Sequence, residues 1–352
     1  MVSDLHLGSH TKRDVLQSAE QRAPLLREAA ECDRLVLLGD LTELRHGPQR
    51  DALEAARGPL TELGAALAPG AEVLIVPGNH DHELLSGWLA RRARSGPPPA
   101  LGLESVVEIE PGDTLDQIAQ WLGPAPVRAL YPGVWLRADV YATHGHYADL
   151  HLTMPTIERL VAGVMGRIVG LRARGPRSAE HYEQALAPIY AWIHAVAQRI
   201  EPELSGSLHG GSVRGWNALT GPGRRRVRER ALVAAFPALI FALNRAGIGP
   251  LSPDLSGAAL RRAGLRGAEQ ALWRLGVEAP YVIFGHTHRA GPLPGDDAGE
   301  WRTTAGAQLV NSGCWVSEPS FLGPDPSRSP YRVGFAVRLR DEGPPELVNL
   351  LD

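Results

Sequence analysis

The stretch that most constrains the fold is an apolar run, Val73 to Val76, that ends directly in Pro77-Gly78 and a polar triplet, Asn79-His80-Asp81. A short apolar run that stops at a Pro-Gly pair is typical of a buried strand that enters a tight turn. The turn would therefore hold an amide, an imidazole and a carboxylate together at the carboxyl end of the strand. Folding alone does not require that triplet, so the stretch indicates both an α/β core and a chemical site.

The same arrangement recurs along the chain. Apolar runs at 35–38, 140–142 and 281–284 also end in residues such as Asp, Glu or His, and one further motif stands almost at the first residue. In open α/β sheets ligands gather outside the carboxyl ends of strands, so these segments can converge on one spot. The five motifs are Asp4-Leu-His6, Gly39-Asp40-Leu-Thr-Glu43, Gly78-Asn79-His80-Asp81, His144-Gly-His146 and Gly285-His286-Thr-His288.

Composition fits a globular protein and narrows its partners. The 352 residues are 44% hydrophobic and 21% charged, with a net charge of -3, which is typical of soluble domains and gives no basic field for nucleic acid. Cys32 and Cys314 cannot build a disulfide framework. No signal segment is evident, and no apolar run reaches the roughly 20 residues of a membrane span. We therefore expect a cytoplasmic protein with no nucleic acid as a stable partner.

The chain divides by composition into a core and an insertion. Strands alternate with helices, expected near 14–31, 49–67 and 83–94, as in α/β folds. From residue 150 to 279 alanine, leucine and arginine dominate with a helical period, before strand character returns. We therefore predict a core domain formed by 1–149 and 280–352, with a helical cap inserted at 150–279.

The residue types in the motifs favour a metal site. Asp, Asn and His supply hard oxygen and imidazole nitrogen ligands, which suit Mn, Fe, Zn or Co. With this many ligands, the economical interpretation is two metal ions about 3.5–4 Å apart that clamp the attacking and leaving oxygens of a phosphate. Each residue taken singly is equally explained as a turn or capping residue. The joint pattern favours the metals.

The ordered series D-x-H, G-D-x-x-E, G-N-H-D, H-G-H and G-H-T-H resembles the calcineurin-like metallophosphoesterase family. The resemblance covers residues 1–150 and 280–315 and implies a four-layer αββα sandwich of two mixed β-sheets flanked by helices. It implies two metals, manganese being favoured. The ligands of the first would be Asp4, His6, Asp40 and His288. The ligands of the second would be Asp40, Asn79, His144 and His286.

The resemblance also implies the roles of two residues that do not bind metal. His80 would contact the phosphate and protonate the leaving oxygen, and Glu43 would orient that imidazole, since a carboxylate fixes the tautomer and raises the pKa. A metal-bridging hydroxide would be the nucleophile. Asp81 would only hold the turn. The expected function is that of a hydrolase, a phosphatase or phosphodiesterase acting on a phosphorylated small molecule or lipid.

Two other functions stay open. One is a non-catalytic scaffold of the same fold, although such relatives tend to lose the catalytic histidine or the ligands that this chain retains. The other is a membrane-peripheral hydrolase of a phospholipid or a nucleotide-sugar pyrophosphate, suggested by arginines at 224–230 beside the apolar stretch 231–243. The same arginines also fit a solvated helix start, and the apolar stripe at 157–171 also fits a core. We expect most of the remaining histidines near the motifs to lie at the surface: His10, His46, His82 and His151.

Overall fold

The structure is a computed structural model of the chain and describes residues 1–11, 13–94, 99–153, 175–199, 227–245, 250–254 and 256–352. The stripe at 157–171 and the arginines at 224–226 lie outside these residues. The chain forms two compact units. The first comprises Met1–His146, Tyr190–Pro202 and Val277–Asp352, and the second comprises Tyr147–Ile189 and Glu203–Gly276. The division into a core and a cap expected from the sequence stays a prediction.

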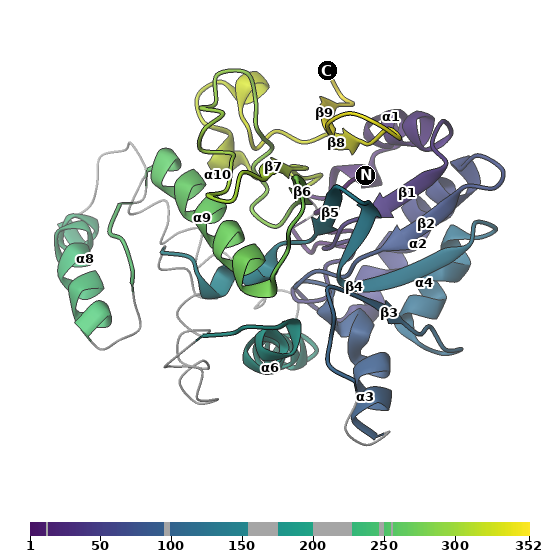
Figure 1. The fold of residues 1–352 in the computed structure, drawn as a ribbon, viewed down its shortest axis with the longest axis horizontal. Coiled ribbons are helices and arrows are strands. Elements are labelled where there is room, and N and C mark those ends of the chain that lie inside the picture. The colour runs from purple at the N-terminus through teal and green to yellow at the C-terminus, as the bar shows by residue number, and fades with distance from the viewer. Residues whose placement is uncertain (12, 95–98, 154–174, 200–226, 246–249, 255) are drawn as a thin grey trace. The chain divides into compact units, whose positions relative to one another are not determined.

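The first unit is built on a seven-stranded mixed sheet (Figure 1). Its strands are β1 (Arg34–Leu37), β2 (Glu72–Ile75), β3 (Glu104–Val107), β4 (Val127–Arg137), β5 (Val140–Thr143), β6 (Tyr281–Phe284) and β7 (Gln308–Asn311). The order is β1-β2-β4-β5-β6-β7, and β3 pairs with β4. Neighbours are parallel except at the β3–β4 and β4–β5 pairs. The described residues thus confirm a mixed α/β fold.

The sheet follows from the apolar runs in the sequence. Strands β1, β2 and β6 each bury three consecutive side chains, as expected for parallel strands covered on both faces. The long strand β4 pairs with β2 through residues 127–129 and with β5 through residues 133–137, so it carries the sheet round a curve. The core includes Val36, Leu74, Leu130, Ala142, Ile283 and Val310.

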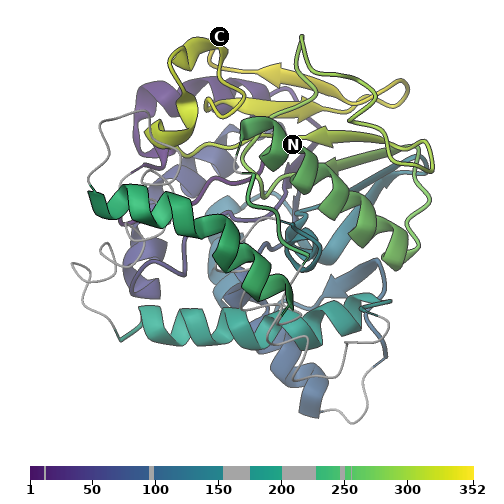
Figure 2. The ribbon, with the colours of Figure 1, turned by 90° about the vertical axis from the view of Figure 1, so that its left-hand side faces the viewer.

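The start of the chain joins a small antiparallel sheet to the large one. It consists of β8 (Phe335–Arg338) and β9 (Glu346–Asn349), the yellow strands in Figure 2. The amino group of Met1 donates to the carbonyl of Val337 at 2.9 Å. On the other side, Val2 exchanges backbone hydrogen bonds of 3.0 and 2.8 Å with Val36 and Leu38. The first residues are therefore paired on both sides, which anchors the motif that follows them.

Helices cover the sheet of the first unit. They are α1 (Ala19–Ala29), α2 (Gln49–Ala66), α3 (Ser86–Arg94), α4 (Thr114–Leu122) and α10 (Pro319–Leu322), with short 3₁₀ turns at Val15–Gln17, His82–Leu85 and Pro326–Arg328. Helix α2 packs on α1 and α4. Its buried residues Ala52, Ala56, Leu60 and Leu63 recur with helical spacing. Cys32 and Cys314 are both free thiols.

The second unit is helical in its described parts. It contains α8 (Val227–Arg245), α9 (Gly257–Leu275) and the first residues of α6 (Ala179–Ala197). Helix α9 is capped at both ends. The Ser256 hydroxyl accepts from the Ala259 amide at 3.2 Å, and Gly276 ends the helix in the left-handed conformation. None of the helices in the described ranges combines the length and apolarity that crossing a bilayer requires.

Candidate metal centre

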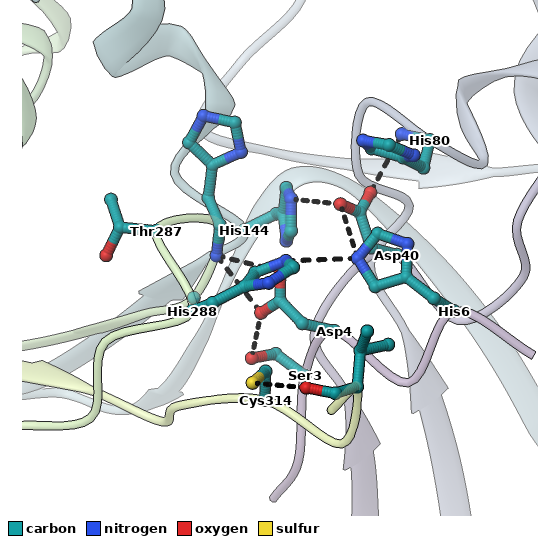
Figure 3. Close-up of polar contacts among 12 residues, drawn as sticks. Ser3, Asp4, His6, Asp40, His80, His144, Thr287, His288 and Cys314 are labelled. Carbon is teal, nitrogen blue, oxygen red and sulfur yellow. Dashed lines mark hydrogen bonds and ion pairs between the residues drawn. The ribbon is translucent and has the colours of Figure 1, made fainter. Parts of the chain in front are cut away.

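The structure gathers all nine residues that the motifs singled out into one cluster in the first unit. They stand just beyond the paired first residues and the carboxyl ends of β1, β2, β5 and β6. Every member is linked to another by a contact described below, and Figure 3 shows the central part of the cluster. The nine are Asp4, His6, Asp40, Glu43, Asn79, His80, His144, His286 and His288.

The backbone at the cluster is strained in a consistent way. Non-glycine residues rarely adopt a positive φ, because it costs about 1–3 kcal/mol each and persists only where the surrounding structure enforces it. Across the described ranges, the non-glycine residues with positive φ all belong to this cluster: Asp4 (54°), His6 (44°), Asp40 (51°), His286 (66°) and His288 (58°). Such strain concentrates at functional sites, so this distribution favours a functional role over a set of incidental turn residues.

One group of ligand atoms is formed by Asp4, His6 and His288, whose donor atoms all lie within 4.8 Å of one another. The Nε2 atoms of His6 and His288 are 3.1 Å apart, and His288 Nε2 is 3.3 Å from Asp4 Oδ1. The Asp4 carboxylate also accepts from the backbone amide of His286 at 3.1 Å and from the hydroxyl of Ser3. These supports fix the carboxylate toward the two imidazoles (Figure 3).

A second group is formed by Asp40, His144 and His286 within the same 4.8 Å limit. Nε2 of His144 lies 3.2 Å from Asp40 Oδ2 and 3.2 Å from Asn79 Oδ1. Nδ1 of His144 donates to the carbonyl of Leu38 at 3.0 Å. This hydrogen bond fixes the tautomer that leaves Nε2 free as a ligand, which is the usual arrangement around a metal-binding histidine.

A third group surrounds Glu43, which is 1% exposed. Its carboxylate accepts from Nδ1 of His6 at 2.8 Å and from Nδ1 of His80 at 2.7 Å, and Nδ1 of His46 lies 3.2 Å away. Because both His6 and His80 use Nδ1 toward Glu43, their Nε2 atoms are left for other partners. The link between Glu43 and His80 is the contact that the resemblance implied, while the link to His6 was not foreseen.

The electrostatics of the cluster fit a bound cation. Asp4, Asp40 and Glu43 are each at most 1% exposed, and buried carboxylates are rare without a charged partner. Burial disfavours their ionisation, yet neighbouring imidazoles hold the pKa of Asp40 and of Glu43 well below the usual range. Burial likewise opposes a charge on His6, but Glu43 and Asp40 raise its pKa to about 9. These buried oxygen and imidazole donors could hold a metal ion.

Two motif glycines are explained by close packing inside the cluster. Gly39 has a φ of +84°, and a Cβ there would overlap the ring of His144. A Cβ on Gly78 would overlap the carboxylate of Asp40. The glycines that precede Asp40 and Asn79 therefore let the neighbouring segments approach closely, which larger residues would prevent.

Asp81 has the structural role expected for it. Its carboxylate accepts from the backbone amide of Gly78 at 2.7 Å and from that of Leu41 at 2.7 Å. It therefore ties the turn after β2 to the loop after β1. This confirms the prediction that Asp81 holds the turn.

Some supporting residues were missed at the level of sequence. The Asn311 side chain donates to the carbonyl of Gly285 at 2.8 Å and to the hydroxyl of Thr287 at 2.9 Å, so it braces the loop that carries His286 and His288. The hydroxyls of Ser3 and Ser312 lie 2.7 Å apart beneath Asp4. The available signal for Asn311 and Ser312 was their place directly after the apolar residues Leu309 and Val310 of β7.

The other histidines near the motifs were expected mostly at the surface, but His82 is buried and His10, His46 and His151 are half-buried. His82 is 7% exposed, the His46 side chain is 11% exposed, and neither His10 nor His151 is in the exposed class. His82 packs its ring 5.2 Å from that of Tyr190, a contact between residues far apart in sequence. Such contacts hide polar residues that a local pattern places in solvent.

His146, a motif residue with no predicted role, lies beside the cluster. It is 1% exposed, its ring centroid is 5.6 Å from that of His144, and Nε2 is 3.0 Å from the hydroxyl of Tyr131. Burial, together with the neighbouring histidines, holds the pKa of His146 well below its ordinary value. His146 is thus a neutral neighbour of the cluster.

The end of α6 supports the loop that carries Glu43. Nδ1 of His194 donates to the carbonyl of Leu44 at 3.0 Å, and the Gln198 side chain donates to the carbonyl of Gly47 at 3.1 Å. The guanidinium of Arg45 lies 5.8 Å from the ring centre of Tyr190. These residues all belong to the first unit. A helix from the middle of the chain therefore helps to position a residue near its start.

Comparison of the chain with models of protein families found no match, and comparison with curated proteins found no significant match.

Proposed function

We propose that the chain is a dimetal-dependent phosphoesterase of the calcineurin-like type, a hydrolase of a phosphomonoester or a phosphodiester. The observation that carries this proposal is the convergence of five motifs on one buried cluster in which five of the proposed ligands have positive φ. In this proposal the large mixed sheet and the small sheet, joined through Met1 and Val2, belong to a four-layer αββα sandwich.

Two ions would share the cluster, with Asp40 between them. The first would be held by Asp4, His6, Asp40 and His288. The second would be held by Asp40, Asn79, His144 and His286. When bound, such ions supply Lewis acidity toward phosphate oxygens and activate water as a nucleophile. Manganese is the favoured metal, since the ligands are hard oxygens and imidazoles with no thiolate among them.

His80 is placed to serve the leaving group. Its side chain is 18% exposed, whereas that of Glu43 is 1% exposed, so His80 can meet a substrate that Glu43 cannot reach. Nδ1 of His80 donates to Glu43, which leaves Nε2 to face the substrate. Burial lowers the pKa of His80 although Glu43 raises it, so the ring would take up a proton together with the substrate, and Nε2 would then hydrogen-bond a phosphate oxygen and give that proton to the leaving oxygen. Its backbone amide donates to Asp40 Oδ1 at 2.8 Å. This hydrogen bond fixes the position of His80, the proposed acid, relative to Asp40, the proposed ligand of both metals.

The scaffold alternative finds less support. A scaffold has no need to keep every proposed ligand, the acid and its orienting carboxylate buried together, as Asp40, Asn79 and Glu43 are. Strained backbone is also lost easily when nothing selects for it. The substrate would be a phosphorylated small molecule or lipid.

Metal analysis combined with hydrolysis assays tests the proposal. Protein treated with chelator and then loaded with Mn²⁺ should contain bound metal and hydrolyse p-nitrophenyl phosphate or bis(p-nitrophenyl) phosphate. Chelated protein without added metal is the control and should be inactive. Bound metal without hydrolysis of either ester would favour the scaffold. Neither metal nor hydrolysis would overturn the metal centre and the enzyme together.

A further inference from the structure

Helix α8 turns apolar side chains toward solvent. Among residues 235–245, Leu239 is 52% exposed and Phe241 is 65% exposed, whereas Ile240 is 2% exposed. Ala235, Ala238, Leu239 and Ala242 are all exposed and recur with the spacing of a single helix face. A surface helix of a globular protein normally directs charged and polar residues to solvent. In this part of α8 the pattern is reversed.

The exposed face has no charge of its own. Residues 231–243 contain no charged side chain and include Phe236, Pro237 and Phe241. Scattered exposed hydrophobic residues are normal on protein surfaces, but a continuous apolar face marks a binding surface. Figure 2 shows α8 in green along its full length. Ile240 is the buried residue of this stretch, and the exposed apolar residues on the other sides of the helix are candidates for binding a partner.

The two ends of α8 are mostly cationic. The helix contains three arginines and one acidic residue, Glu229, although the whole chain has a net charge of -3. Arg228 and Arg230 stand in the first turn of α8, and Arg245 is its last residue. Cations at a helix N-terminus oppose the helix dipole. Helix formation therefore does not explain their position, and a negatively charged partner would.

We propose that α8 binds an anionic lipid bilayer, with its exposed apolar face in the headgroup region. Interfacial helices bind in this way, burying apolar side chains at the acyl boundary while basic residues attract anionic lipids. A protein partner is a weaker fit, because the centres of protein interfaces are rich in large aromatic anchors, whereas this face is mostly alanine. The inference stands apart from the proposed hydrolysis and holds whether or not the metal centre is active.

Vesicle flotation of the full chain tests this inference. The protein should float with phosphatidylcholine vesicles that contain phosphatidylglycerol, and much less with pure phosphatidylcholine. Leu239→Glu/Phe241→Glu should reduce flotation at least about tenfold, because charged groups resist entry into the bilayer. Val106→Glu is the matched control, since Val106 is 59% exposed on β3 of the first unit, and it should float as the wild type does. Added salt should weaken binding by screening the arginines.

A second measurement keeps the inference testable if the double variant unfolds. Ala238→Cys labelled with an environment-sensitive dye should show a blue-shifted emission on vesicles with phosphatidylglycerol. Absence of that shift, or flotation of a folded double variant equal to that of the wild type, would overturn the proposal. A wild-type dimer that does not float and that the double variant converts to a monomer would identify the face as a contact between two copies instead.

Discussion

His6 and His80 are held by the same carboxylate oxygen. Nδ1 of each ring lies within 2.8 Å of Oε2 of Glu43, and the two rings meet edge to face with centroids 4.6 Å apart. In the proposed mechanism His6 is a metal ligand and His80 is the acid. One buried side chain therefore orients a residue of each kind, and damage to Glu43 should affect both metal binding and proton transfer.

Glu43→Gln should weaken metal binding and lower kcat in the same variant. The amide removes the negative charge and no longer fixes both imidazoles, and loss of such a supporting group costs about 10–100-fold in metal affinity or activity. Metal titration and kcat at saturating metal separate the two effects. Glu54→Gln, at an exposed position of α2, is the control and should change neither. A fall in kcat with unchanged metal affinity would restrict Glu43 to orienting His80.

His80→Ala should retain metal and lose activity. The link from His80 to the metal cluster is made by its backbone amide, which the substitution preserves. Loss of a general acid lowers the rate about 10²–10⁴-fold. Metal content by elemental analysis and kcat on an ester with a poor leaving group are the measurements. An unchanged kcat would exclude the acid role.

Asp40→Asn should release metal. Asp40 faces both His144 and His6, at 3.2 and 3.6 Å, so its charge is shared by the two proposed sites. Elemental analysis after dialysis should find less metal than in the wild type. Asp33→Asn, at an exposed position before β1, should retain the wild-type amount. Full metal content in Asp40→Asn would contradict the assigned ligand set.

Asp81→Ala should destabilise the fold without directly removing a ligand. The buried amides of Gly78 and Leu41 would lose their acceptor, and each unsatisfied group costs about 1–3 kcal/mol. Asp81→Asn keeps a carbonyl oxygen and should lose less. Denaturant unfolding of the three proteins gives the free energies of unfolding. Equal stability of wild type and Asp81→Ala would show that these hydrogen bonds contribute nothing net.

Metal affinity should rise with pH. Burial opposes protonation of the ligand imidazoles, but nearby carboxylates raise the pKa of His6 to about 9 and that of His144 to about 10. At neutral pH both rings are therefore positively charged, each with a second proton that a metal ion must displace. Competition between that proton and the metal weakens as pH rises through those values. Calorimetry in buffers with different ionisation enthalpies should detect proton release on binding. Affinity that does not change between neutral and alkaline pH would contradict this.

Much of the site was predictable because it depends on short local patterns. Strand β6 was predicted at 281–284 and observed at Tyr281–Phe284, since a continuous apolar run buried on both faces has few alternatives. The polar residues directly after such runs then predicted which side chains form the cluster. Strand β4 extends over Val127–Arg137 and is longer than the apolar runs within it, because its first residues are held by pairing with β2 and β3.

The contacts that sequence reasoning missed are between distant segments. His194 meets the carbonyl of Leu44 from 150 residues away, and Asn311 braces the loop after β6. His194 stands in no distinctive pattern, and the only signal for Asn311 is its place after the apolar end of β7. Both residues fill hydrogen bonds that only the folded chain creates. The burial of His82 has the same origin.

The left-handed backbone at Asp4, His6, Asp40, His286 and His288 bears on how the chain can evolve. Glycine would relax the backbone at every one of these positions, so selection for stability alone would remove the aspartates and histidines. Under the proposed function, their presence reflects a selection that opposes stability. A lineage freed from the need for these side chains should lose them early, and it should gain heat resistance as it does so.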